Sequence, residues 1–289
     1  MKNRDIFTGL INAVYDEKNF KWKFFLTRSY KKTVCSLLSY IASADDQDRN
    51  NFKSMLNGNV QVDSVGDTKY ERISKAKKVA ETRTLINGNV LTDKNVFVVG
   101  SSWDKDEEVL LPVIDKINSN GHVKEHPLMT IIAPHEPTED TLEEIEYDVQ
   151  VKYPHLKLIR YSSLNKYRDE NIILIDCIGI LMSLYKYADL AYVGGGFQTG
   201  MHNVLEPAGY GIPVLFGDQK LSEDAENLIS KGGGIAIDDQ KSLYKNLLHL
   251  LKNDEARLNI GIKSFSVFDS KNDASKKIAK ILNKKVLNI

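Results

Sequence analysis

The 289-residue chain has 39 basic and 39 acidic residues, so no overall field draws it toward nucleic acid. Its two cysteines, Cys35 and Cys177, lie far apart without metal-ligand spacing, which is typical of a reducing compartment. No apolar run approaches the ~20 residues of a membrane span, and the first residues do not resemble a signal peptide. Length and composition therefore indicate a soluble, cytoplasmic protein of about two domains.

Residues 1–90 are expected to form a partial α/β domain. Helical patterns run up to Leu38 and over residues 45–56, and short strands are expected near residues 40–42 and 60–62. An incomplete sheet exposes strand edges, which usually pair with a partner. Aromatic side chains among lysines could form a membrane-surface patch, although packing into their own domain is the more common arrangement; these are Phe20, Trp22, Phe24 and Phe25.

Residues 91–268 alternate short apolar runs with longer amphipathic ones. The alternation predicts a Rossmann-like domain, a parallel sheet with helices on both faces. The expected strands are residues 96–99, 130–133, 156–159, 172–175, 190–193, 212–216 and 234–237. The expected helices are residues 107–118, 139–152, 181–187, 222–230 and 240–252. The tail, residues 269–289, is expected to be a basic amphipathic helix that packs on the amino-terminal domain, with Ile278, Ile281 and Leu282 on one face.

The strand at residues 190–193 ends in three glycines, Gly194, Gly195 and Gly196. Glycines there let backbone N–H groups approach an anion, and the N-terminus of the following helix adds positive potential. Asn203 can cap that helix, and its Glu206 can accept hydrogen bonds from two ribose hydroxyls. This pattern favours a nucleotide-sugar site, in which Gly195 or Gly196 should have a positive φ or lie against the ligand.

The alternative is a tight turn with no ligand, since such turns are common in α/β domains. Thr199 stands where the third glycine of G-x-G-x-x-G would fall, and no P-loop is present. Four loops nevertheless end at the same predicted edge of the sheet, because the carboxyl ends of parallel strands meet there. They contain Ser101 and Ser102, Pro134 and His135, residues 176–180, and the glycine run with His202.

Six ordered motifs resemble the 3-deoxy-D-manno-octulosonic acid (Kdo) transferases, which are inverting glycosyltransferases of the GT-B fold. The resemblance runs from about Ile6 to Leu282 and corresponds to the carboxyl-terminal two-thirds of the family. The motifs are Val65-Gly-Asp-Thr-Lys-Tyr-Glu-Arg, Gly100-Ser-Ser-Trp with Glu107 and Glu108, Ile132-Ala-Pro-His-Glu, Ile175-Asp-Cys-Ile-Gly-Ile-Leu, Val193-Gly-Gly-Gly-Phe and His202-Asn-Val-Leu-Glu-Pro-Ala.

The resemblance implies that the protein transfers Kdo from CMP-Kdo to a lipid A precursor, without a metal or cofactor, in lipopolysaccharide synthesis at the cytoplasmic face of the inner membrane. Lys69 falls where the family places a cation that stabilises the transition state. The residues at the family's CMP-binding positions are Pro134, His135, Ile178, Gly179, Ile180, Asn203, Val204, Leu205 and Glu206. The predicted site also includes Ser101, Ser102, Gly195, Gly196 and His202.

The chain departs from the family pattern at three places. Pro134-His135-Glu136 stands where many members have Pro-Arg-His, and Gly179-Ile180 where many have Gly-Glu. Nothing before Ile6 supplies the family's general base, so roughly the first third of a full-length enzyme is expected to be missing. We therefore expect a fragment, a split product that works with a complementary amino-terminal segment, or a degenerate member, and no Kdo transfer by this chain alone. A non-catalytic nucleotide-sugar-binding module and a UDP-sugar epimerase or other GT-B transferase are the alternatives.

Overall fold

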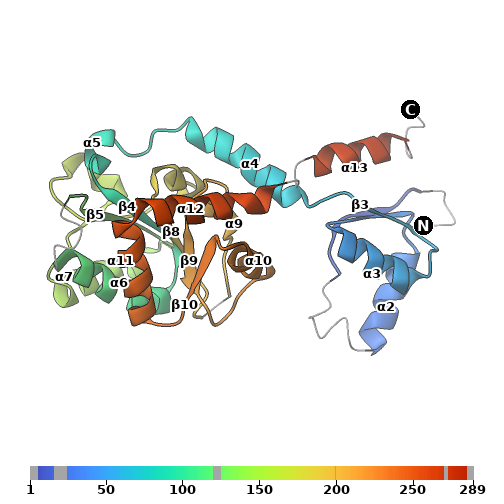
Figure 1. The fold of residues 1–289 in the computed structure, drawn as a ribbon, viewed down its shortest axis with the longest axis horizontal. Helices are drawn as coiled ribbons and strands as arrows, with labels where there is room; N and C mark the ends of the chain where they lie inside the picture. Colours follow the sequence, from blue (N-terminus) through green and yellow to red (C-terminus); the bar gives the residue numbers. More distant parts are fainter. Residues whose placement is uncertain (1–5, 16–24, 120–124, 199, 270–272, 285–289) are drawn as a thin grey trace. The chain divides into compact units, whose positions relative to one another are not determined.

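A seven-stranded parallel sheet organises residues 73–267, the larger of two units in the computed structural model of the chain (Figure 1). The smaller unit comprises residues 1–72 and 268–289. The structure describes residues 6–15, 25–119, 125–198, 200–269 and 273–284. Phe20, Trp22 and Phe24 of the proposed aromatic patch lie outside the described residues.

The larger sheet has the strand order β10-β9-β8-β4-β5-β7-β6. Its strands are β4 (Asn95–Ser102), β5 (Leu128–Pro134), β6 (Leu158–Arg160), β7 (Ile172–Leu174), β8 (Leu190–Val193), β9 (Val214–Gly217) and β10 (Gly234–Ile237). The helices of this unit are α5 (Gly88–Leu91), α6 (Asp104–Ser119), α7 (Glu139–Lys152), α8 (Leu181–Leu184), α9 (Leu205–Ala208), α10 (Glu223–Lys231), α11 (Gln240–Lys252) and α12 (Asp254–Phe265). Helix α4 (Thr68–Glu81) begins in the smaller unit and continues in the larger one.

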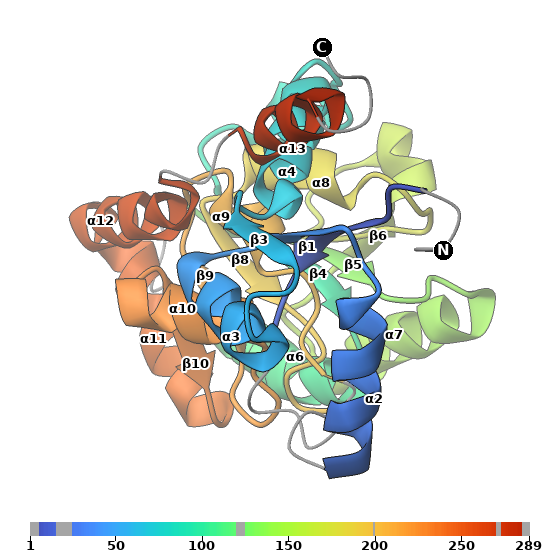
Figure 2. The ribbon, with the colours of Figure 1, turned by 90° about the vertical axis from the view of Figure 1, so that its right-hand side faces the viewer.

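Both faces of the larger sheet are buried under helices. Successive residues of a strand point to opposite faces, so Phe97 and Val99 of β4 join a core with α6, α7 and α11. Val96 and Val98 join a second core with α5 and α8 on the other face. Figure 2 shows α10, α11 and α12 side by side along one flank of this unit. Burial on two faces explains why the strands read as continuous apolar runs.

Side-chain caps fix where several of these helices begin. Thr138, Ser222 and Asp239 precede α7, α10 and α11, and the side-chain oxygen of each accepts a hydrogen bond from a backbone N–H of the first turn. Helix α10 ends at Gly232, whose φ of 77° is left-handed. The caps place the helix starts beside the carboxyl ends of the strands that precede them.

The smaller unit contains a three-stranded parallel sheet with the order β1-β2-β3. Its elements are β1 (Gly9–Ala13), β2 (Tyr40–Ser43), β3 (Gln61–Ser64), α2 (Phe25–Ser36), α3 (Asp46–Leu56) and α13 (Ala274–Leu282). Ile41 and Val62 pack with Phe52 of α3 on one face. Tyr40 packs with Ile278 of α13 in a separate cluster, and Ile281 and Leu282 complete it. The carboxyl-terminal helix therefore supplies part of this unit's core.

The structure confirms the α/β class and every strand and helix predicted in residues 91–268, with small differences at their ends. Helices α4, α5 and α12 and strand β1 were not predicted. Helix α12 gave no clear pattern because Leu258 and Ile262 are exposed whereas Gly261 and Ser264 are buried. The division between the units falls after Arg72, not at residue 90, because Ile86 and Val90 pack into the core of the larger unit.

Candidate functional site

The loops after β4 and β8 meet where the strand order of the sheet reverses. The chain leaves β4 toward β5 on one side and later places β8 on the other side of β4. Ligands of open parallel sheets bind outside the carboxyl ends of the strands at such a point. The Gly194 N–H donates a hydrogen bond to the Gly100 carbonyl, with an N···O distance of 2.9 Å, so the start of the loop after β8 is bonded to β4.

Close packing explains the three glycines after β8. A Cβ on Gly194 would lie 2.1 Å from the Ser101 carbonyl oxygen, and one on Gly196 would lie 2.3 Å from that of Gly217. Gly195 has a φ of 91°, as predicted for one residue of the run, and its Cβ would lie 2.3 Å from the Gly200 oxygen. Each of the three positions therefore excludes a side chain. At Gly194 and Gly196 the Cβ would collide with a neighbouring strand, and at Gly195 the left-handed conformation also disfavours a side chain.

Asp106, in the first turn of α6, forms hydrogen bonds that fix the glycine run. Its Oδ2 accepts hydrogen bonds from the N–H groups of Gly195 and Trp103, at 2.9 and 3.0 Å. Its Oδ1 accepts one from the Tyr192 hydroxyl at 2.7 Å. The side chain is fully buried, and burial raises the pKa of the Asp106 carboxyl although the three hydrogen bonds oppose that shift. One carboxylate thus links β8, the glycine run and the β4–α6 turn.

These bonds correct one expectation about the glycine run. The N–H groups of Gly194 and Gly195 donate to the Gly100 carbonyl and to Asp106, so they are not available to a phosphate. Helix α9, which carries Glu206, has a single turn, so its dipole is too short to attract an anion as expected. These two glycines therefore shape the edge of the sheet by packing and by hydrogen bonds within the protein.

Ser102 is buried, and its hydroxyl donates to Glu107 Oε1 at 2.8 Å. Burial raises the pKa of Glu107 to about 7. The hydrogen bond from Ser102 lowers this pKa, and nearby carboxylates raise it by smaller amounts. The Ser102 side chain therefore supports the loop from inside. Ser101, at the end of β4, has a φ of 55°, an uncommon conformation for serine.

Three aromatic rings from three strand ends stack at this edge. The Trp103 and His202 rings are nearly coplanar, with an interplanar angle of 15°, and Trp103 Nε1–H donates to His202 Nε2 at 2.9 Å. His135, which follows Pro134, stacks on both, with centroid distances of 4.7 and 4.3 Å. Because indole nitrogen only donates, neutral His202 must carry its proton on Nδ1. Burial and then His135 lower the pKa of His202, which favours this neutral form.

The loop after β7 presents a bare apolar side chain. Ile178 is 83% exposed, and the next residue, Gly179, has a φ of 83° with no atom near the position of a Cβ. Ile180 follows as the residue that precedes α8. An isoleucine this exposed at the carboxyl edge of a sheet is available to contact a ligand.

Glu206 is half-buried, and its Oε1 accepts a hydrogen bond from Asn203 Nδ2 at 3.0 Å. Asn203 Oδ1 accepts from the Leu205 N–H at 3.2 Å, so Asn203 organises the turn as predicted, although the residue directly before α9 is Val204. The Val204 and Leu205 side chains are buried in the core. Of the predicted Asn203–Glu206 segment, only the two polar side chains, Asn203 and Glu206, are not buried.

Lys69 belongs to the smaller unit, whereas the other predicted site residues belong to the larger one. Its Nζ lies 3.2 Å from Asp67 Oδ2, and its backbone N–H donates to Asp67 Oδ1 at 2.8 Å. The Asp67 carboxylate thereby holds the lysine at the start of α4.

Within the described part of the chain, no group of three histidine, cysteine or acidic side chains is arranged to hold a metal ion. The same residues include no helix with the length and hydropathy needed to cross a bilayer.

Comparison with known proteins places the chain beside Kdo transferases. It is 34% identical over 169 residues to the 3-deoxy-D-manno-octulosonic acid transferase of Chlamydophila psittaci (strain ATCC VR-125 / 6BC), covering 57% of this chain and 36% of that protein. It is 30% identical over 216 residues to the transferase of Chlamydia muridarum (strain MoPn / Nigg), covering 67% and 45%. The chain thus spans less than half the length of these relatives. No protein-family model matches it.

Solved structures show the same fold. The C-terminal CMP-Kdo binding domain of WaaA from Acinetobacter baumannii matches 69% of this chain and 99% of its own, with a TM-score of 0.55 and 20% identity. A putative UDP-N-acetylglucosamine 2-epimerase from Listeria monocytogenes matches 100% of this chain and 70% of its own, with a TM-score of 0.61 and 15% identity. The chain therefore has the Rossmann-like α/β fold of GT-B proteins.

The sequence analysis did not assign a role to Trp103 or Asp106. Trp103 lies between β4 and α6, and Asp106 lies in the first turn of α6, a few residues after Ser101 and Ser102. The available signal was the acidic first turn of α6, where Asp104, Asp106 and Glu107 follow a buried strand. Which of these carboxylates points inward depends on the packing of β8, and so could not be predicted.

Proposed function

We propose that this chain, a sequence relative of the Kdo transferases, binds the CMP part of CMP-Kdo where β4 and β8 meet, and that its protein transfers Kdo to a lipid A precursor. The observation that carries the proposal is the position of Glu206. Its carboxylate, held by Asn203, lies in α9, the helix after the glycine-run loop, on the side of the sheet where the strand order reverses.

A half-buried carboxylate is suited to a ribose because it accepts hydrogen bonds from both vicinal hydroxyls. Asn203 Nδ2 donates to one Glu206 oxygen and so orients the group before a ligand arrives. The exposed Ile178 and the backbone around Gly179 offer an apolar contact for a base. Together these groups supply the orienting contacts of a nucleoside site.

Departure of CMP concentrates negative charge on its phosphate, which has to be stabilised. With the Gly194 and Gly195 amides already bonded, the His202 Nδ1–H and the His135 ring are side-chain donors that could serve at this edge, since His202 Nε2 is engaged by Trp103. Lys69 is proposed, from the motif that contains it, to add a positive charge at the same step. The acceptor hydroxyl needs a general base, which we assign to no residue of this chain.

Calorimetric titration with CMP, UMP and UDP tests the nucleotide. We expect CMP to bind most tightly, and Glu206→Ala to weaken it by about 2–3 kcal/mol because the lost acceptor is charged. Glu143→Ala, which removes an exposed carboxylate from α7, is the matched control and should leave CMP affinity unchanged.

Two outcomes would contradict the proposal. Equal CMP affinity of the Glu206→Ala and parent proteins would show that Glu206 does not hold the ribose. A clear preference for UDP over CMP would favour a UDP-sugar enzyme of the same fold. Transfer itself is tested by supplying CMP-Kdo and a lipid A precursor and following the release of CMP.

A further inference from the structure

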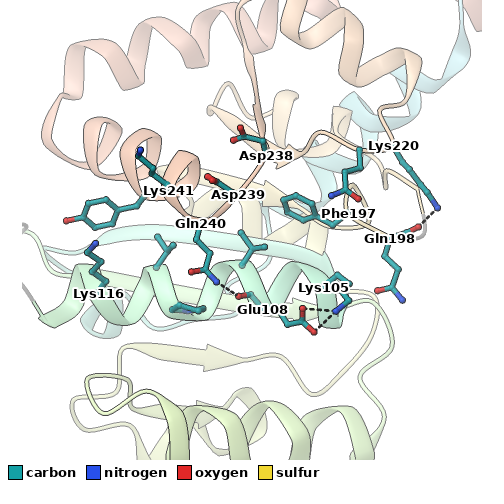
Figure 3. A pocket seen from close by; sticks show the side chains of 15 residues that line it. Lys105, Glu108, Lys116, Phe197, Gln198, Lys220, Asp238, Asp239, Gln240 and Lys241 are labelled. Atoms are coloured by element: carbon teal, nitrogen blue, oxygen red, sulfur yellow. Dashed lines mark hydrogen bonds and ion pairs between the residues drawn. The ribbon is translucent and has the colours of Figure 1, made fainter.

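A cavity of about 1050 Å³ lies in the larger unit between α6, α11 and the loops that follow β8, β9 and β10 (Figure 3). It shares no lining residue with the proposed nucleotide site. The two are adjacent through the glycine run, because Phe197 lines the cavity and directly follows Gly196. The Lys220 N–H donates to the Gly196 carbonyl at 3.0 Å, which fixes a second lining residue to the same loop.

Part of the cavity lining is apolar, and a hydrogen bond joins its two helices. Val109 and Pro112 of α6 line the cavity together with Tyr244 of α11 and Phe197. Pro112 has no N–H, so the Glu108 carbonyl one turn earlier lacks its helical partner. Gln240 Nε2 donates to that carbonyl at 3.0 Å and joins the two helices, as the dashed line in Figure 3 shows.

The charges around this wall favour an anion. The Lys116 ammonium lies 4.4 Å from the centre of the Tyr244 ring, Lys220 Nζ donates to the Gln198 carbonyl, and Lys241 is exposed. Across the described ranges, none of these three lysines forms an ion pair with a carboxylate.

The three carboxylates of the lining are already engaged. Lys105 pairs with Glu108 at 2.8 Å. Asp239 Oδ1 accepts from the Ser242 N–H at 2.7 Å, and hydrogen bonding to Ser242 lowers the pKa of Asp238. The Lys105–Glu108 pair is neutral, and Asp238 and Asp239 remain ionised, so together with Lys116, Lys220 and Lys241 the lining keeps one net positive charge.

We propose that this cavity binds a small amphipathic anion, in which an apolar group lies against Phe197, Tyr244 and α6 while a phosphate or carboxylate meets Lys116 or Lys220. Sites for small ligands combine an apolar wall with a few convergent polar groups, and this cavity has the volume and both components. The inference goes beyond the proposed function and does not depend on it.

Titration of the 289-residue protein with decyl phosphate, below its micelle concentration, tests the inference by calorimetry. Saturable binding of one molecule is expected, with no heat from inorganic phosphate, which lacks the apolar group, and weaker binding of neutral decyl maltoside. Decyl carboxylate in a parallel titration distinguishes the two head groups. Equal affinity for decyl phosphate and decyl maltoside, or no binding of any amphiphile, would overturn the proposal.

Variants locate the binding. Lys116→Gln with Lys220→Gln should weaken decyl phosphate about tenfold, since each exposed charge pair contributes modestly. Phe197→Ala should weaken decyl phosphate and decyl maltoside alike. Lys245→Gln, on α11 next to the lining residue Tyr244 but outside the lining itself, is the control for loss of a lysine and should change nothing. An unchanged affinity in the double lysine variant would overturn the assignment.

Competition separates this inference from the proposed function. CMP should bind with the same affinity when the cavity is saturated with decyl phosphate. Displacement of decyl phosphate by CMP would overturn the inference, because the cavity would then belong to the nucleotide site. If CMP does not bind at all but decyl phosphate does, the proposed function fails while this inference stands.

Discussion

The Asp106 carboxylate accepts a hydrogen bond from the Gly195 N–H at 2.9 Å, which ties the start of α6 to the loop after β8 across the adjacent strands β4 and β8. If the buried Asp106 carboxylate is removed, the three groups that donate hydrogen bonds to it are left without an acceptor. The geometry of the glycine run therefore depends on a residue far from it in the sequence.

Asp106→Asn should destabilise the larger unit by about 1–3 kcal/mol, because the amide NH₂ group replaces an oxygen that faces N–H or O–H donors. Chemical denaturation followed by circular dichroism measures the change. Asp104→Asn, an exposed residue of the same helical turn, is the control and should cost much less. Equal stabilities of the two variants would show that the Asp106 network contributes little.

The pKa of Glu107, raised to about 7 from an ordinary 4.5, predicts a pH dependence of stability. The folded state holds the Glu107 proton more tightly than the unfolded state, so this group stabilises the fold at low pH, and its contribution is lost as the pH rises from about 4.5 through 7. Thermal unfolding of the parent and Glu107→Gln proteins at pH 5 and pH 8 measures it.

Since other carboxylates also titrate, the difference between those two proteins is the informative quantity. Glu107→Gln should lose less stability than the parent between pH 5 and pH 8. Parallel pH profiles would contradict the raised pKa.

Gly195→Ala should be among the most damaging single substitutions in the larger unit. The left-handed conformation alone costs an alanine about 1–2 kcal/mol, and the clash with the Gly200 oxygen adds to it. Gly200→Ala is the control, because Gly200 also has a positive φ, of 109°, but no atom lies within 4 Å of its Cβ position. The difference in their unfolding free energies isolates the clash, and no difference would mean that the loop relaxes freely.

Trp103→Phe should raise the pKa of His202. It keeps an aromatic ring in the stack but removes the N–H that donates to His202 Nε2 and stabilises the neutral imidazole. Titration of the histidine ring signals by NMR measures the shift, with His202→Gln used to assign the resonance. An unchanged pKa would show that burial and His135 alone determine it.

The sequence was sufficient to predict most strands and helices of the larger unit. Its strands are buried on both faces and its helices are amphipathic, and both properties give local sequence patterns. Residues 139–152 and 240–252 show helical periodicity and match α7 and α11. Helix α12 failed this test, since its exposed Leu258 and Ile262 break the pattern of a surface helix.

The motifs around Gly195, Asn203 and Glu206 could likewise be found in the sequence, because the order of strand, glycines and short helix is a property of one contiguous segment. The sequence predicted a positive φ or a ligand contact at Gly195 or Gly196, and the structure has the positive φ at Gly195. What the glycines do was decided only by tertiary structure: their N–H groups meet Gly100 and Asp106, which come from another strand and helix. The stacking of Trp103, His135 and His202 also required folding, since three separate strand ends bring these rings together. Hydrogen bonds and ring contacts between distant segments depend on strand order and register, which local periodicity does not encode.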